Sequence, residues 1–105
     1  MLVQVNTDSN IEGSSERSQW IEAAITGALD RFGDQITRVE VHLRDRNSDK
    51  KSGGADMDCL LEARVAGLQP QVVSHQAATL EEAVDGAVGK MKRSLVSTLG
   101  RLGQR

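Results

Sequence analysis

Hydrophobic and polar residues alternate in four short stretches of the chain, which is the period of a β-strand with one buried face. The alternation is clean in residues 36–44, where Val39, Val41 and Leu43 fall on one side and charged residues on the other. The predicted strands are residues 2–7, 36–44, 57–66 and 71–77. In the last of them, Val72 and Val73 are neighbours and leave the inward-facing register open.

Two longer stretches place apolar residues at steps of three and four, the period of an amphipathic helix. The first helix starts at Ser14 or Ser15, either of which is a good N-cap, and Gly33 is placed to end it. Its apolar stripe consists of Trp20, Ile21, Ala24, Ile25, Ala28, Leu29 and Phe32. Because both aromatic residues lie on this stripe, we expect Trp20 and Phe32 to pack in the core rather than to stack on bases.

The second helix, residues 79–102, starts with Thr79 and Glu82 at the spacing of a capping box. The apolar side of this helix consists of Leu80, Ala83, Val84, Ala87, Val88, Met91, Leu95 and Leu99. A second stripe, roughly opposite at about 100° per residue, combines small and basic residues. It consists of Gly86, Lys90, Arg93, Ser97 and Arg101. This outer face of the helix is the best candidate for a functional surface.

The order β-α-β-β-β-α predicts an α+β fold in a single domain spanning residues 1–105. A sheet with one charged face and two helices with one apolar stripe each predict a two-layer sandwich, in which both helices cover the same face. The four-stranded sheet should be mixed. We expect its first two strands to be parallel and its second and third to form a hairpin around residues 45–56.

Composition is typical of a soluble globular protein, with 38% hydrophobic and 27% charged residues and no apolar run of membrane-spanning length. The first ten residues lack the basic start and the long apolar stretch of a signal peptide. The single cysteine, Cys59, agrees with a reducing compartment. We therefore expect a cytoplasmic protein without a membrane partner.

Charge is distributed unevenly along the chain. From Gly86 onward there are five basic residues and no acidic one, so the net charge of −2 leaves −7 for residues 1–85. Such asymmetry is typical of a surface that binds a polyanion. It is equally what the helix dipole favours, since Glu81, Glu82 and Asp85 lie at the helix start and the basic residues lie later.

One loop has a partial calcium-binding pattern. Asp45, Asn47 and Asp49 have the spacing that opens a calcium loop, and Asp56 stands at the twelfth position. Lys50, however, occupies the place where the sharp turn requires glycine. A solvated hairpin loop is therefore the preferred interpretation.

No other pattern indicates catalysis. Neither His42 nor His75 has a further His or Cys at ligand spacing, and Cys59 falls on an inward strand face. We expect no enzyme activity, no metal, no cofactor and no small-molecule substrate.

Gly86 and Gly89 each cost a helix about 1 kcal/mol relative to alanine. Either a solvated face tolerates this cost or a phosphate backbone approaches closely there.

Two segments resemble the ribosome hibernation promoting factor family, also called ribosome-associated inhibitor A, in its short form (sigma-54 modulation protein / S30EA-like). They are V-E-V-H-L at residues 39–43 and A-V-x-x-A-V-x-K-M-K-R-S-L at residues 83–95. The resemblance implies a fold like a double-stranded-RNA-binding domain with an added strand. It also implies a non-enzymatic protein that binds 16S rRNA of the small ribosomal subunit near the decoding centre, and that inhibits translation or stabilises idle ribosomes under stress.

The resemblance also implies which residues contact rRNA. Lys90 and Arg93 match basic helix positions of the family, and Lys92 and Arg101 belong to the same charge cluster. The predicted rRNA-binding residues are these four and the two arginines of the first helical region, Arg17 and Arg31. Contacts of this kind go to phosphates and supply affinity and position rather than base specificity.

A second hypothesis follows from the departures from the family pattern. Glu81 replaces a tyrosine of the family, the first helix carries several acidic residues, and Leu60 falls on the polar face of its strand. These features are typical of a protein-interaction module that keeps the fold and has lost ribosome binding.

Overall fold

The computed structural model describes residues 1–8, 15–45 and 57–103, with side chains as far as Gly100. Its elements are β1 (Leu2–Thr7), α1 (Ser15–Leu29), the short 3₁₀ helix η1 (Asp30–Phe32), β2 (Ile36–Asp45), β3 (Met57–Val65), β4 (Gln71–Ala77) and α2 (Leu80–Gly103). Every predicted strand and both predicted helices are present. The boundaries differ from the prediction by at most one residue except at the end of the first helix, where α1 ends at Leu29 and the last predicted turn forms η1.

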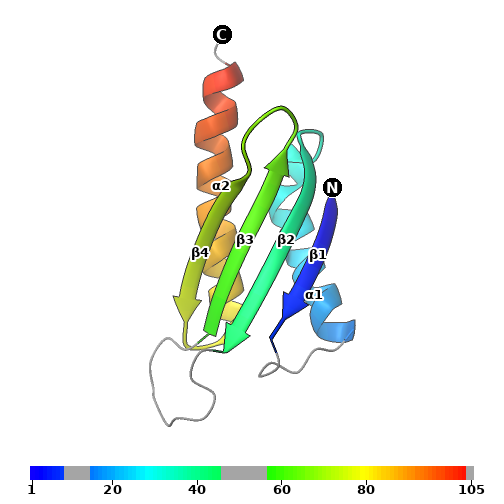
Figure 1. The fold of residues 1–105 in the computed structure, drawn as a ribbon, viewed down its shortest axis with the longest axis vertical. Coiled ribbons are helices and arrows are strands. Elements are labelled where there is room, and N and C mark those ends of the chain that lie inside the picture. The colour runs from blue at the N-terminus through cyan, green and yellow to red at the C-terminus, as the bar shows by residue number, and fades with distance from the viewer. Residues whose placement is uncertain (9–14, 46–56, 104–105) are drawn as a thin grey trace.

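The strands form one mixed sheet in the order β1-β2-β3-β4. β1 runs parallel to β2, with Val3 opposite Val39 and Val5 opposite Val41. β2, β3 and β4 follow as antiparallel neighbours. Figure 1 shows both helices on the same side of this sheet, which confirms the predicted α+β two-layer sandwich.

The core lies between the sheet and the helices. β2 and β3 supply the inward residues of their alternating patterns, and each helix supplies its apolar stripe. The fully or almost fully buried hydrophobic side chains are Ile21, Ile25, Leu29, Phe32, Ile36, Val39, Val41, Leu43, Cys59, Leu61, Ala63, Val65, Ala83, Val84, Ala87, Val88, Met91 and Leu95. The edge strands β1 and β4 contribute only partly buried residues such as Val3, Val5 and Val73.

Local interactions at the ends of the helical segments agree with the sequence signals. The hydroxyl of Thr79 accepts a hydrogen bond from the backbone N–H of Glu82 (3.1 Å) and donates one to the Glu82 carboxylate (3.2 Å). Thr79 therefore caps α2 as predicted. The reciprocal half of the capping box differs, because the carboxylate of Glu82 accepts from the hydroxyl of Thr79 and not from its backbone N–H. At the end of η1 the backbone N–H of Gly33 donates to the carbonyl of Asp30 (2.9 Å).

The structure corrects the expectation for Trp20 and decides which valine of β4 faces the core. Trp20, expected in the core, is 38% exposed, because at about 100° per residue it stands about 140° around α1 from the buried Ile25. In β4 the inward-facing residue that the sequence left open is Val73, which packs toward the core, while Val72 is 57% exposed.

Three positions of the calcium-loop pattern, Asn47, Asp49 and Asp56, lie outside the described residues.

Candidate nucleic-acid interface

The longest element, α2, carries most of the predicted site residues. Its 24 residues correspond to about 36 Å of helix. Figure 1 shows that its C-terminal turns extend past the end of the sheet, while its first turns lie behind β3 and β4. The second half of α2 therefore has a larger free surface than the first.

The three basic residues of α2 within one turn spread over its exposed surface. Lys90, Lys92 and Arg93 are all exposed. At about 100° per residue, Lys90 lies on the flank next to β4, Arg93 on the outer side and Lys92 on the opposite flank. The three charges thus cover a broad arc of the helix rather than a single line.

These three charges are not neutralised within the described part of the chain, where no ion pair involves any of them. The ammonium group of Lys90 donates a hydrogen bond to the backbone carbonyl of Ser74 in β4 (2.8 Å), which positions it without cancelling its charge. An array of exposed and unpaired positive charges is the electrostatic feature that binds phosphates.

Contacts with the edge strand β4 fix the orientation of α2. The side-chain oxygen of Gln71 accepts hydrogen bonds from the hydroxyls of Ser94 (2.7 Å) and Thr98 (3.4 Å). One turn before Lys90, a β-carbon on Gly86 would overlap the imidazole of His75. Gly86 therefore allows α2 to lie close against β4, which is neither of the two explanations that the sequence offered for this glycine.

Gly89 differs from Gly86 in its surroundings. A β-carbon at Gly89 would lie 3.6 Å from a guanidinium nitrogen of Arg93, an ordinary contact distance. Nothing in the described structure therefore requires glycine at this position.

The remaining predicted site residues lie apart from this group. Arg17 is half-buried in the first turns of α1, beside Glu81 at the start of α2. Arg31 lies at the opposite end of α1, in η1, with its guanidinium carbon 4.9 Å from the centroid of the Phe32 ring. The side chain of Arg101 lies outside the described part. The structure thus groups Lys90, Lys92 and Arg93 and places Arg17 at the acidic end of α2.

The open face of the sheet has a different electrostatic character. Its arginines pair with carboxylates on the same face: Arg38 with Glu40 (3.2 Å), Arg44 with Asp58 (3.3 Å) and Arg64 with Glu62 (4.0 Å). These pairs leave the three arginines balanced by three acidic groups. This face is therefore a poorer surface for a polyanion than the exposed side of α2.

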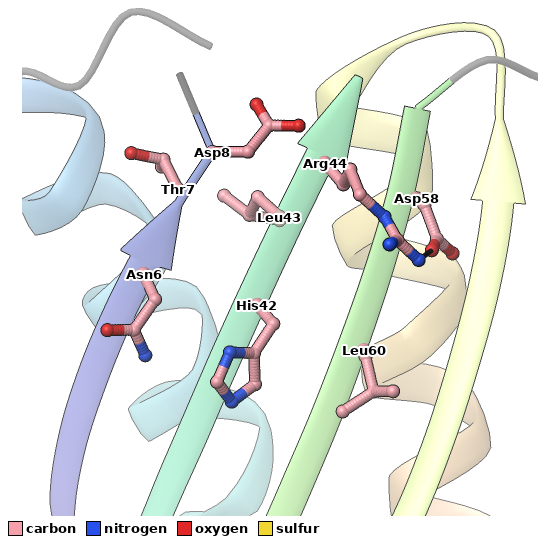
Figure 2. Close-up of a pocket in the computed structure, with 8 residues that line it drawn as sticks. All are labelled: Asn6, Thr7, Asp8, His42, Leu43, Arg44, Asp58 and Leu60. Carbon is pink, nitrogen blue, oxygen red and sulfur yellow. Dashed lines mark hydrogen bonds and ion pairs between the residues drawn. The ribbon is translucent and has the colours of Figure 1, made fainter. Parts of the chain in front are cut away.

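A shallow depression on the open face contains no recognisable catalytic arrangement. Figure 2 shows that its polar groups come from β1, from Asp8 directly after β1, and from β2 and β3. The pair Arg44 and Asp58 lies at one end, and Asn6 and His42 lie at the other. Across residues 1–8, 15–45 and 57–103 there is no group of three His, Cys, Asp or Glu side chains that could hold a metal ion.

The only thiol is buried beneath the sheet surface. Cys59 has no exposed surface, and burial, with a smaller contribution from the neighbouring Asp58 carboxylate, raises its pKa to about 12. A thiol that stays protonated at neutral pH is a poor nucleophile. Cys59 therefore serves as a core residue.

Comparison with known proteins identifies relatives in sequence and fold. A family model described as sigma 54 modulation protein / S30EA ribosomal protein matches residues 3–102. No curated protein matches the chain. The N-terminal domain of Protein Y from Thermus thermophilus superposes with a TM-score of 0.70 at 20% identity, over 90% of this chain and 96% of that one.

A second solved structure, a ribosomal subunit interface protein from Coxiella burnetii, superposes with a TM-score of 0.71 at 13% identity, over 95% of this chain and 99% of that one. At these identities the two solved structures support the fold alone, and the family model supports the membership in the family.

None of the helices in the described ranges has both the length and the apolar character of a membrane-crossing segment.

Proposed function

The chain belongs to the sigma 54 modulation protein / S30EA ribosomal protein family, and on this premise we propose that it is a ribosome-associated protein without enzymatic activity. It binds rRNA of the small subunit near the decoding centre through the exposed surface of α2. Occupying that site inhibits translation or keeps idle ribosomes intact under stress. The proposed location is the cytoplasm, where ribosomes are found.

One observation carries this proposal: Lys90, Lys92 and Arg93 are exposed on α2 and form no ion pair with any described residue, whereas the arginines of the open sheet face are paired with carboxylates. When a positive side chain neutralises a phosphate, counterions are released from the nucleic acid and binding becomes more favourable. A side chain that is already paired with a carboxylate contributes less to this release. The exposed side of α2 is therefore the proposed primary contact. Arg31, Arg101 and Arg17 are proposed as secondary contacts.

The rigid attachment of α2 to β4 supports the same role. Hydrogen bonds from Ser94 and Thr98 to Gln71, and from Lys90 to Ser74, hold the helix along the sheet edge. A basic surface that is fixed before binding loses less conformational entropy when it meets a fixed arrangement of phosphates. This suits a protein that occupies one site on a large RNA.

A second candidate function is a protein-interaction module that has lost ribosome binding. The specific observation in its favour is the acidic start of α2, where Glu81 and Glu82 are exposed, near the acidic first turn of α1. On this hypothesis the basic half of α2 serves only to complement the helix dipole.

Co-sedimentation with isolated small subunits distinguishes the two. The variant Lys90→Glu/Lys92→Glu/Arg93→Glu should lose binding, while wild-type protein should pellet with the subunits. The single reversal Arg93→Glu should already weaken binding, and its matched control is Arg64→Glu on the open sheet face, also an exposed position. Equal binding of the triple variant and the wild type would exclude α2 as the interface. A pull-down from stationary-phase extract that recovers one protein and no ribosomal RNA would favour the second function.

A further inference from the structure

The exposed Trp20 lines a shallow hollow where the first turns of the two helices meet. Glu16, Arg17 and Trp20 from α1 and Leu80 and Glu81 from α2 form this hollow. Trp20 is the only tryptophan of the chain and is 38% exposed. A large aromatic side chain left accessible next to a half-buried leucine is typical of a contact surface rather than of the core.

The charges around the hollow favour one kind of partner. Glu16 and Glu81 are exposed, and Arg17 is the cationic side chain among the residues that line the hollow. The two carboxylates outnumber the guanidinium of Arg17, so the hollow as a whole favours a cationic side chain, which would find both carboxylates and an accessible indole.

We propose that this hollow binds a lysine- or arginine-rich segment of a partner protein. A cationic side chain contacts the indole of Trp20, and its N–H groups donate to the carboxylates of Glu16 and Glu81. The apolar stem of the same side chain packs on Leu80. This goes beyond the proposed rRNA contact, because the hollow lies at the first turn of α2 and the basic residues lie about three turns later.

The location allows the two surfaces to act together. Both helices begin at the same end of the molecule, as Figure 1 shows, and α2 then runs past the sheet toward the other end. A basic peptide at the helix starts and phosphates along the second half of α2 would each meet charges of the opposite sign. The chain would then bridge a basic protein segment and an RNA backbone.

Fluorescence of Trp20 provides a direct test, because the chain has no other tryptophan. The full chain is titrated with an eight-residue peptide of alternating lysine and glycine, and in parallel with the same peptide carrying glutamate in place of lysine. We expect a saturable change in emission with the lysine peptide and none with the glutamate peptide. The variant Glu16→Gln/Glu81→Gln should bind the lysine peptide roughly two- to thirtyfold more weakly, since two exposed ion pairs are lost.

Matched controls separate a specific site from general attraction. Asp30→Asn/Asp34→Asn removes the same charge from exposed positions at the other end of α1 and should bind the peptide like wild type. Trp20→Ala, followed by calorimetry, should also weaken binding. Equal losses in both double variants, calorimetric binding without a change in Trp20 emission, or stronger binding of a single-stranded RNA oligonucleotide at Trp20 would each overturn the proposal.

Discussion

The imidazole of His75 on β4 occupies the space that a β-carbon on Gly86 of α2 would need. This relationship, and not solvent exposure, explains a glycine in the middle of a long helix. It also brings the helix backbone close enough to β4 for the ammonium group of Lys90, one turn later, to reach the carbonyl of Ser74 at 2.8 Å. The placement of a proposed RNA-binding residue thus depends on a packing contact away from the RNA.

The first prediction concerns this contact. Gly86→Ala should gain little stability or lose some, because the helix-propensity gain of about 1 kcal/mol is opposed by displacement of His75. In a His75→Ala background the same substitution should be stabilising. Chemical denaturation of the four proteins in this double-mutant cycle measures the coupling.

Gly89→Ala is the matched control for this cycle. It lies one turn from Gly86 and would meet only an ordinary contact with Arg93, so it should stabilise the protein by up to about 1 kcal/mol. A Gly86→Ala variant that is stabilised as much as Gly89→Ala would contradict the packing explanation.

The second prediction concerns the start of α2. Thr79→Ala removes the hydroxyl that accepts the N–H of Glu82 and should lower the free energy of unfolding by about 1 kcal/mol. Thr79→Ser keeps the hydroxyl and should retain most of the stability. Equal stability of the alanine and serine variants in urea denaturation would show that the cap contributes nothing.

The third prediction concerns Cys59. Its pKa is about 12 in the folded protein against an ordinary value of 9.0, so the unfolded chain loses this proton first as the pH rises. The contribution of Cys59 to stability is therefore complete below about pH 9 and is lost progressively between pH 9 and about 12.

Two measurements check this prediction. A thiol reagent at pH 8 should modify Cys59 only after denaturant is added, since the residue has no exposed surface. Stability should fall less steeply above pH 9 in Cys59→Ala than in the wild type. Rapid modification of the native protein would contradict the buried position.

Most of the fold could be predicted from the sequence, because strand alternation and helical period are local signals. The strands at residues 2–7 and 71–77 have the predicted limits, and Thr79 caps α2. Trp20 was wrongly assigned to the core because it follows the apolar steps along the sequence while its angle around the helix points it outward. The angle of about 140° around α1 between Trp20 and Ile25 distinguishes the exposed side chain from the buried one.

The site was predictable in part. The run of basic residues in α2 is visible in the sequence, and Arg38 and Glu40 stand two residues apart on one face of β2. The pairing of Arg44 with Asp58, however, depends on strand register, and the fit of Gly86 to His75 depends on how α2 crosses β4. Such contacts join residues that no sequence spacing links. For this reason these contacts cannot be predicted from the sequence alone.

The salt dependence of binding to isolated small subunits tests the central claim most directly. If Lys90, Lys92 and Arg93 each neutralise one phosphate, raising the salt from about 50 to 200 mM should weaken wild-type binding roughly 20- to 40-fold. Arg93→Gln should bind with a shallower dependence, its slope of log K against log salt smaller by about 0.7 to 0.9. Arg64→Gln, on the open sheet face, should keep the wild-type slope. An unchanged slope in Arg93→Gln, or binding that does not respond to salt, would contradict an RNA interface on the exposed side of α2.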